Sequence, residues 1–138
     1  MNSIPDLRIV LIDDNEIDLL LHERLIAIQQ ISRTVLSFNN ANKALEYLSS
    51  NVTLPQIPPT VILLDIQMPE MDGFEFLRSF DSYPNKIKNQ CYIIMVSSSL
   101  DFGDINRTNA NPLVVRLLKK PLQPRELKEV IEGIFKEQ

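Results

Sequence analysis

Apolar runs alternate with helix-like patterns from one end of this chain to the other, and that order restricts the fold more than any other feature. Five runs are rich in apolar residues and short enough to be strands buried in a sheet. These runs are residues 7–12, 32–38, 61–64, 91–96 and 113–118. Parallel strands need long, right-handed connections, so helices between successive strands predict one parallel sheet covered on both faces. We therefore predict an α/β fold with a doubly wound, five-stranded parallel sheet.

The first connection carries a helical pattern of apolar residues. Asn15 is placed to cap the first turn, because its side chain can accept hydrogen bonds from the free amide groups there. One apolar stripe recurs at helical spacing and is formed by Ile17, Leu20, Leu21, Leu25 and Ile28. We predict that this stripe faces the sheet. His22, the one histidine of the chain, is expected to be a solvated side chain of this helix.

Four further helices are expected, which makes five in all. They are predicted to begin after Asn39 or Asn40, at Gly73, within 100–112 and at Pro124. The helix within 100–112 should be short or frayed, because that stretch contains a glycine, three asparagines and a proline. The proline-rich segment 51–60 and the polar segment 81–90 are predicted loops. Phe74, Phe76 and Phe80 are expected to lie wholly or partly in the core.

Length and composition set the scale of the molecule. The chain has 138 residues, 44% of them hydrophobic, which suits one domain with a single core. We expect a domain over residues 1–138, with its core at about 6–137 and no output domain. A net charge of −4 argues against nucleic acid as a partner. One cysteine, no signal-peptide pattern and no long apolar run predict a cytoplasmic protein that does not cross a membrane.

Polar residues suited to one reaction follow four of the five predicted strands. Asp13 and Asp14 follow the first strand, Asp65 the third, Ser97 the fourth and Lys120 the fifth. In open parallel sheets, ligands bind beyond the carboxyl ends of the strands, where the strand order reverses. If the order is 2-1-3-4-5, these side chains converge on one small cavity. The alternative is that aspartate follows strands only because it favours turns.

The three carboxylates at this edge, Asp13, Asp14 and Asp65, would repel each other. One of them must therefore be protonated, or a cation must lie among them. The candidate ligand atoms are oxygens, with no histidine or cysteine nearby, which favours Mg²⁺ over zinc and leaves Mn²⁺ as the alternative. Mg²⁺ commonly binds one or two carboxylates together with a phosphate oxygen. The sequence therefore predicts a site for a phosphoryl group.

The segment 65–73 carries the most specific motif of the chain. It follows the pattern D-x-x-M-P-x-x-D-G, in which the proline stiffens the turn and the final Asp-Gly begins a helix. Together with the residues at the other strand ends, and with Pro121 directly after Lys120, this motif strongly resembles the receiver domain of bacterial response regulators. The resemblance covers essentially the whole chain. It implies a flavodoxin-like sheet in the order 2-1-3-4-5 and a stand-alone, single-domain receiver of the chemotaxis type.

The resemblance implies a role for each acidic residue. Asp65 is expected to be the phosphoacceptor, whose carboxylate attacks a phosphohistidine and becomes an aspartyl phosphate. Asp14 and Asp65 are expected to bind Mg²⁺ directly, together with the backbone carbonyl of Gln67, and Asp13 is expected to act through water. A phosphoryl-transfer transition state is stabilised mainly by positioning and by positive charge, which agrees with these roles.

The hydroxyl of Ser97 and the ammonium of Lys120 are expected to bind the new phosphoryl group. Lys119 is the rival candidate, but the residue directly before the proline matches the motif, and the resemblance implies a cis peptide bond between Lys120 and Pro121. Ser97 and Leu117 occupy the switch positions of the family. Leu117 departs from the family pattern, since receivers usually carry tyrosine or phenylalanine there, so the usual ring movement is not expected.

The implied function is signalling. The domain would accept a phosphoryl group from a sensor histidine kinase or a histidine phosphotransfer protein and then change its binding to a downstream protein. It would assist its own phosphorylation and dephosphorylation without being a turnover enzyme on an external substrate. By resemblance, the first helix would face the kinase. The helix within 100–112, the strand 113–118 and the last helix would carry output or homodimer contacts.

Three other functions fit parts of the pattern. A pseudo-receiver would share the fold and only bind proteins, and Leu117 is the main support for it. A haloacid-dehalogenase-type phosphatase also forms an aspartyl phosphate, but it needs a second carboxylate where Gln67 stands here. A flavodoxin-like flavin carrier would offer hydroxyl and amide groups to a phosphate in its first loop, whereas the acidic segment 13–16 would repel one.

Overall fold

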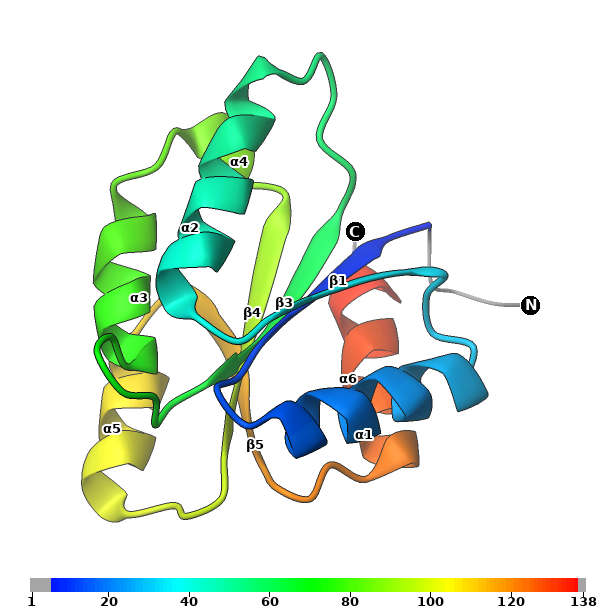
Figure 1. Cartoon of the computed structure of the whole chain (residues 1–138), viewed down its shortest axis with the longest axis vertical. Helices are drawn as coiled ribbons and strands as arrows, with labels where there is room; N and C mark the ends of the chain where they lie inside the picture. Colours follow the sequence, from blue (N-terminus) through cyan, green and yellow to red (C-terminus); the bar gives the residue numbers. More distant parts are fainter. Residues whose placement is uncertain (1–5, 137–138) are drawn as a thin grey trace.

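The computed structural model describes residues 6–136, which form one sheet with helices on both sides (Figure 1). In chain order the elements are β1 (Arg8–Ile12), α1 (Glu16–Ile28), β2 (Thr34–Phe38), α2 (Ala41–Ser50), the 3₁₀ turn η1 (Asn51–Thr53), β3 (Thr60–Asp65), α3 (Gly73–Asp81), α4 (Asn85–Lys88), β4 (Cys91–Ser97), α5 (Phe102–Ala110), β5 (Val114–Lys119) and α6 (Pro124–Lys136). Residue 137, the predicted end of the domain core, lies outside the described residues. Within 6–136, no helix has the length and apolar character needed to span a bilayer.

The five strands are parallel and lie in the order β2-β1-β3-β4-β5, as predicted. The α/β fold class is thereby confirmed, and each strand limit agrees with its predicted range to within two residues. Every residue of β1 and β3 is buried, which explains why those strands are almost continuously apolar. Ile12 of β1 lies opposite Leu64 of β3, so the residues that follow these strands emerge side by side.

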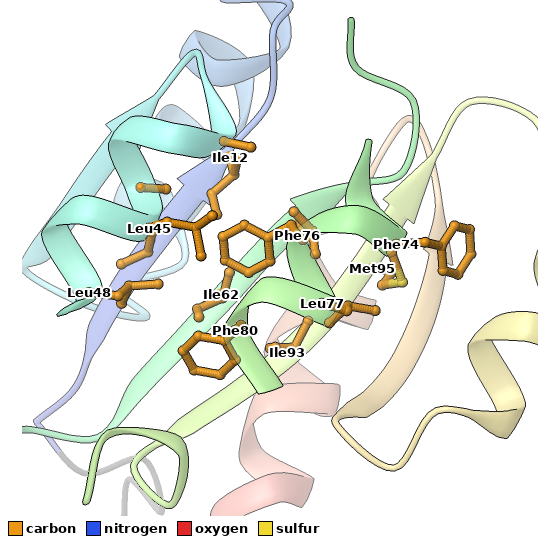
Figure 2. Packing of buried hydrophobic residues seen from close by; sticks show 14 of the residues in the cluster. Ile12, Leu45, Leu48, Ile62, Phe74, Phe76, Leu77, Phe80, Ile93 and Met95 are labelled. Atoms are coloured by element: carbon orange, nitrogen blue, oxygen red, sulfur yellow. The ribbon is translucent and has the colours of Figure 1, made fainter. Parts of the chain in front are cut away.

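Two apolar clusters hold the helices against the two faces of the sheet. One cluster packs α2 and α3 against the sheet and contains Phe74, Phe76 and Phe80, all buried as expected (Figure 2). The other packs α1 and α6 against the opposite face. α5 joins the first face, where the guanidinium of Arg107 lies 3.8 Å from the centre of the Phe74 ring. The core is therefore divided by the sheet into two halves.

The predicted orientation of α1 is wrong. Its buried residues are Leu19, His22 and Ile26, whereas the predicted stripe includes Ile17 and Ile28, which are 70% and 77% exposed. Apolar residues occur almost all round this helix, so their periodicity does not select one face. His22 occupies the middle of the buried face, is 6% exposed, and is not the solvated side chain that we predicted.

The predicted number of helices is also wrong, because there are six α-helices over residues 6–136. The additional helix is α4, a single turn within the segment 81–90 that we predicted to be a loop. It begins after Pro84 and inserts Ile87, which is 1% exposed, into the core. α5 is short, as expected, and its N-cap Asp101 accepts a hydrogen bond from the backbone amide of Asp104.

Candidate phosphoacceptor and metal site

Three aspartates meet at the carboxyl edge of the sheet, at the ends of β1 and β3. Each of Asp13, Asp14 and Asp65 offers a carboxylate oxygen that lies within 4.8 Å of the others. Asp13 and Asp65 are only 3% and 6% exposed, whereas Asp14 is open to solvent. Close carboxylates with oxygen donors and one solvent-facing member suit a hard divalent cation such as Mg²⁺. The donor set therefore fits the metal that the sequence predicts.

The loop from Asp13 to α1 fixes the position of the first carboxylate. The backbone amide of Asn15 donates to Asp13 Oδ1 at 2.9 Å. The Asn15 side chain in turn accepts from the backbone amides of Ile17 and Asp18 at 3.0 and 3.1 Å, and it caps α1 as predicted. These contacts join Asp13 and the first turn of α1 into one hydrogen-bonded unit.

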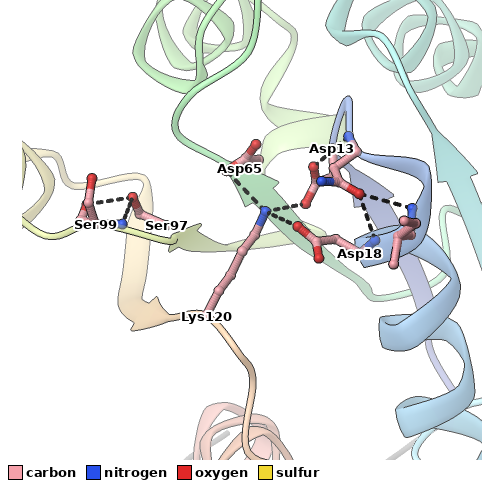
Figure 3. Close-up of polar contacts among 8 residues, drawn as sticks. Asp13, Asp18, Asp65, Ser97, Ser99 and Lys120 are labelled. Carbon is pink, nitrogen blue, oxygen red and sulfur yellow. Dashed lines mark hydrogen bonds and ion pairs between the residues drawn. The ribbon is translucent and has the colours of Figure 1, made fainter.

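Lys120 reaches the acidic cluster from the segment after β5. Its ammonium donates to Asp13 Oδ2 at 2.6 Å and to Asp18 Oδ2 at 2.9 Å, and it lies 3.5 Å from Asp65 Oδ1 (Figure 3). Its backbone amide donates to the carbonyl oxygen of Ser97 at 2.8 Å. The peptide bond from Lys120 to Pro121 is cis, as expected. The rival lysine, Lys119, is exposed.

The charges in this site shift one another's protonation. Burial and the negative charge of Asp13 raise the pKa of Asp65 to about 7, although the Lys120 ammonium opposes the shift. Burial alone would lower the pKa of Lys120, but hydrogen bonds to Asp13 and Asp18 outweigh burial and raise that pKa. Lys120 therefore stays positively charged. A further positive charge beside Asp65 would stabilise the ionised form of its carboxyl group.

The loop between β3 and α3 holds Asp65 by close backbone contacts. The amide of Ile66 donates to the carbonyl of Val96 on β4, and the amide of Gly73 donates to the carbonyl of Ile66. A Cβ atom at Gly73 would lie 2.8 Å from the Asp65 carbonyl oxygen, so only glycine fits here without displacement. Asp72 and Glu75 form a reciprocal capping box that fixes the start of α3.

The remaining residues of the predicted site lie around this cluster. Ser97 is fully buried, and its hydroxyl donates to the carbonyl of Ser99 at 2.6 Å. It also accepts from the Ser99 amide at 3.2 Å, so the hydroxyl is hydrogen-bonded within the loop that follows β4. Leu117 is partly buried against the α2–α3 side of the core. The side chain of Gln67, whose carbonyl is a predicted metal ligand, is exposed.

Sequence reasoning missed Asp18, which contacts Lys120 directly. A signal was available, because Asn15 was identified as the helix cap and Asp18 is three residues further on. An acidic side chain in the first turn of this helix starts close to the edge of the sheet where Asp13 lies.

The matches to known proteins agree with this geometry. The family model described as the response regulator receiver domain matches residues 9–132. A response regulator receiver protein from Dyadobacter fermentans is 35% identical, with 94% of this chain and 98% of that chain covered and a TM-score of 0.86. A two-component response regulator from Cytophaga hutchinsonii is 26% identical, with coverages of 95% and 98% and a TM-score of 0.85.

Curated relatives are longer proteins. The sensor histidine kinase CheAY of Helicobacter pylori is 32% identical over 70% of this chain, which spans 11% of the kinase. A protein-glutamate methylesterase/protein-glutamine glutaminase of Trichodesmium erythraeum is 27% identical over 97% of this chain, which spans 36% of that enzyme. The chain thus belongs to the response regulator receiver domain family of two-component signalling. A receiver domain is a signalling domain.

Proposed function

We propose that this protein accepts a phosphoryl group on Asp65 from a sensor histidine kinase or a histidine phosphotransfer protein, and that phosphorylation changes its binding to a downstream protein. The observation that carries the proposal is the convergence of Asp13, Asp14 and Asp65, with the ammonium of Lys120 paired to Asp13 and Asp65. An accumulation of negative charge beside a fixed cation is suited to a divalent ion and a phosphoryl group together.

The proposed reaction forms one bond and breaks one. A carboxylate oxygen of Asp65 attacks the phosphorus atom of a phosphohistidine whose other ring nitrogen is protonated, the phosphorus–nitrogen bond breaks, and the histidine leaves as a neutral imidazole. Lys120 pairs with the phosphoryl oxygens and offsets the charge that gathers between two anions. The residues that would hold Mg²⁺ are Asp14, Asp65, the carbonyl of Gln67 and, through water, Asp13. When bound, Mg²⁺ would neutralise negative charge on the phosphoryl oxygens.

The response to phosphorylation is proposed to begin at Ser97. Its hydroxyl would leave Ser99 and donate to the phosphoryl group, which frees the loop between β4 and α5. Leu117 has no ring to follow this movement, so we propose that the change is transmitted by repacking of an aliphatic side chain. α5, β5 and α6 would then carry the output or homodimer contacts.

The exposed apolar side of α1 supports docking of a partner beside the site. This surface consists of Ile17, Leu20, Leu21 and Ile28, whose side chains are 70%, 48%, 55% and 77% exposed. An apolar patch of this kind on a polar surface is typical of protein–protein contact. Because α1 begins next to Asp13, a kinase or phosphotransfer domain on this surface would lie within reach of Asp65. Binding to these partners would place the protein in the cytoplasm, which is also what we propose.

The test uses acetyl phosphate or beryllofluoride with Mg²⁺. With acetyl phosphate, we expect intact-mass spectrometry to show one added phosphoryl group. With either reagent, we expect amide NMR spectra to change around β4, α5 and β5. Asp65→Asn should acquire no phosphate, whereas Asp81→Asn, on an exposed part of α3, should behave as the wild type. An unchanged mass together with an unchanged spectrum would disprove the proposal. Phosphorylation without any change in partner affinity would favour the pseudo-receiver.

A further inference from the structure

Asp18 makes a contact that the family roles do not explain. Its carboxylate lies 2.9 Å from the Lys120 ammonium, closer than Asp65 at 3.5 Å. Asp13 is the third partner, at 2.6 Å. The ammonium therefore lies nearer to the two carboxylates at the start of α1 than to the proposed phosphoacceptor (Figure 3).

The backbone of Asp18 is held by the cap of α1. The Asp18 amide donates to the Asn15 side chain, and the Asn15 amide donates to Asp13. Asp13 and Asp18 are thus held relative to each other by the cap of α1. The site also carries more acidic than basic groups, so removing one carboxylate need not leave Lys120 without a partner.

We infer that Asp18 is a positioning residue that holds the Lys120 ammonium on the α1 side of the site while Asp65 is unphosphorylated. This inference rests on the proposed function. Asp13 and Asp18 take two of the three N–H donors of the Lys120 ammonium, so a phosphoryl group on Asp65 would share this cation with the Asp18 carboxylate. The Asp18 carboxylate also adds negative charge near the place where an anionic phosphodonor must approach. Asp18 therefore slows the phosphorylation of Asp65 by small anionic donors.

A purely structural role for Asp18 would be to stabilise the amino end of α1 by its charge. Glu16 provides the matched control, because it is also an acidic residue of the first turn and its side chain is exposed. Glu16→Gln removes one negative charge from the same turn without removing the contact to Lys120. Asp18→Asn removes the negative charge that faces Lys120 and leaves only a neutral amide oxygen as a possible acceptor. Asp18→Glu restores the carboxylate on a longer side chain.

The first experiment measures the rate of phosphorylation by acetyl phosphate at fixed Mg²⁺ with intact-mass spectrometry. We expect Asp18→Asn to be phosphorylated roughly three- to tenfold faster than the wild type, which is the range for loss of one partly buried charge contact. Glu16→Gln should stay within about twofold of the wild type, since the charge of an exposed side chain is screened by water and salt. Asp18→Glu should return towards the wild-type rate. Thermal unfolding of each variant establishes that it is folded.

The second experiment observes the side-chain ammonium of Lys120 by ¹H–¹⁵N NMR without phosphodonor, with the signal assigned by its loss in Lys120→Gln. Asp18→Asn should shift this resonance, and Glu16→Gln should leave it in place. An unshifted resonance, or an Asp18→Asn rate no higher than that of Glu16→Gln, overturns the inference and leaves the proposed function standing. A wild-type protein that never acquires phosphate overturns both.

Discussion

The two ends of β1 both bury charge, but the balance of charge is opposite. At the amino end, Arg8 is 8% exposed, and within residues 6–136 it donates to neutral groups only, at 3.0 Å to Thr60, 2.6 Å to Tyr47 and 2.9 Å to Asn51. At the carboxyl end, Asp13 shares the Lys120 ammonium with other carboxylates. One strand thus runs from an excess of positive charge to an excess of negative charge.

Access to solvent separates the two ends. Arg8 is enclosed, and its Nη2 atom is buried without a hydrogen-bond partner among the described residues. The nearby Cys91 offers no negative charge, because burial raises the pKa of its thiol to about 12. At the carboxyl end, Asp14 is exposed, so an ion can enter. An unpaired charge that is closed off from solvent can act only within the fold, whereas a charge that solvent can reach is available to bind an ion.

The largest effect is expected at the amino end. Arg8→Ala should lower the free energy of unfolding by about 3 kcal/mol, because it removes three hydrogen bonds and leaves a cavity next to polar groups. Urea unfolding measures the change. The exposed Arg33 is the control, and Arg33→Ala should change stability by less than about 0.5 kcal/mol. A loss below about 1 kcal/mol for Arg8→Ala would show that the enclosed charge does not stabilise this end.

The next largest effect is expected at Gly73, in the backbone beside the carboxyl end of β3. Gly73→Ala should destabilise the protein by about 2 kcal/mol, since the new Cβ would lie 2.8 Å from both the Asp65 carbonyl oxygen and the Met95 methyl carbon. The matched control is Gly133→Ala in α6, where no atom lies within 4 Å of the new Cβ. That variant should be more stable by about 0.5 kcal/mol or more. Equal effects of the two substitutions in urea unfolding would contradict the close approach.

A smaller effect is expected from removing one carboxylate of the acidic cluster, that of Asp65. The pKa of Asp65 is raised to about 7 from an ordinary 3.8, so at pH 8 the folded protein carries an ionised group that it disfavours. In metal-free buffer at pH 8, Asp65→Asn should therefore raise the free energy of unfolding, by about 1 kcal/mol. Added Mg²⁺ should stabilise the wild type more than this variant. Calorimetry with Mg²⁺ and with EDTA measures the stability of both proteins. Equal stabilisation of the two by Mg²⁺ would show that Asp65 does not bind the metal.

The smallest effect is expected at His22, beneath the carboxyl end. Burial lowers its pKa from 6.5, although the charges of Asp13 and Asp18 act in the opposite direction and Lys120 reinforces the lowering. The unfolded chain therefore binds a proton more readily, and stability from this group is lost as the pH falls below 6.5. Between pH 7.5 and 5.5, wild-type stability should fall relative to that of His22→Gln. Parallel urea-unfolding profiles for the two proteins would contradict this.

The fold was predictable because neighbouring residues carry the relevant information. β1 and β3 are short apolar runs buried on both faces, and Asp13 and Asp65 follow their ends directly. In a parallel sheet those ends lie together, so strand order alone brings the two carboxylates to one edge. α4 was missed because its one buried side chain, Ile87, gives no periodic signal within four residues.

The sequence by itself determined the parallel sheet, its order through the family motif, and the set of polar groups at its carboxyl edge. Tertiary structure alone decided which side of α1 is buried, since that helix has apolar residues on nearly every side and only packing against the sheet selects Leu19, His22 and Ile26. It also decided that Asp18 shares the Lys120 ammonium with Asp13. Electrostatic partners more than a hundred residues apart depend on distances in space, which no local pattern encodes.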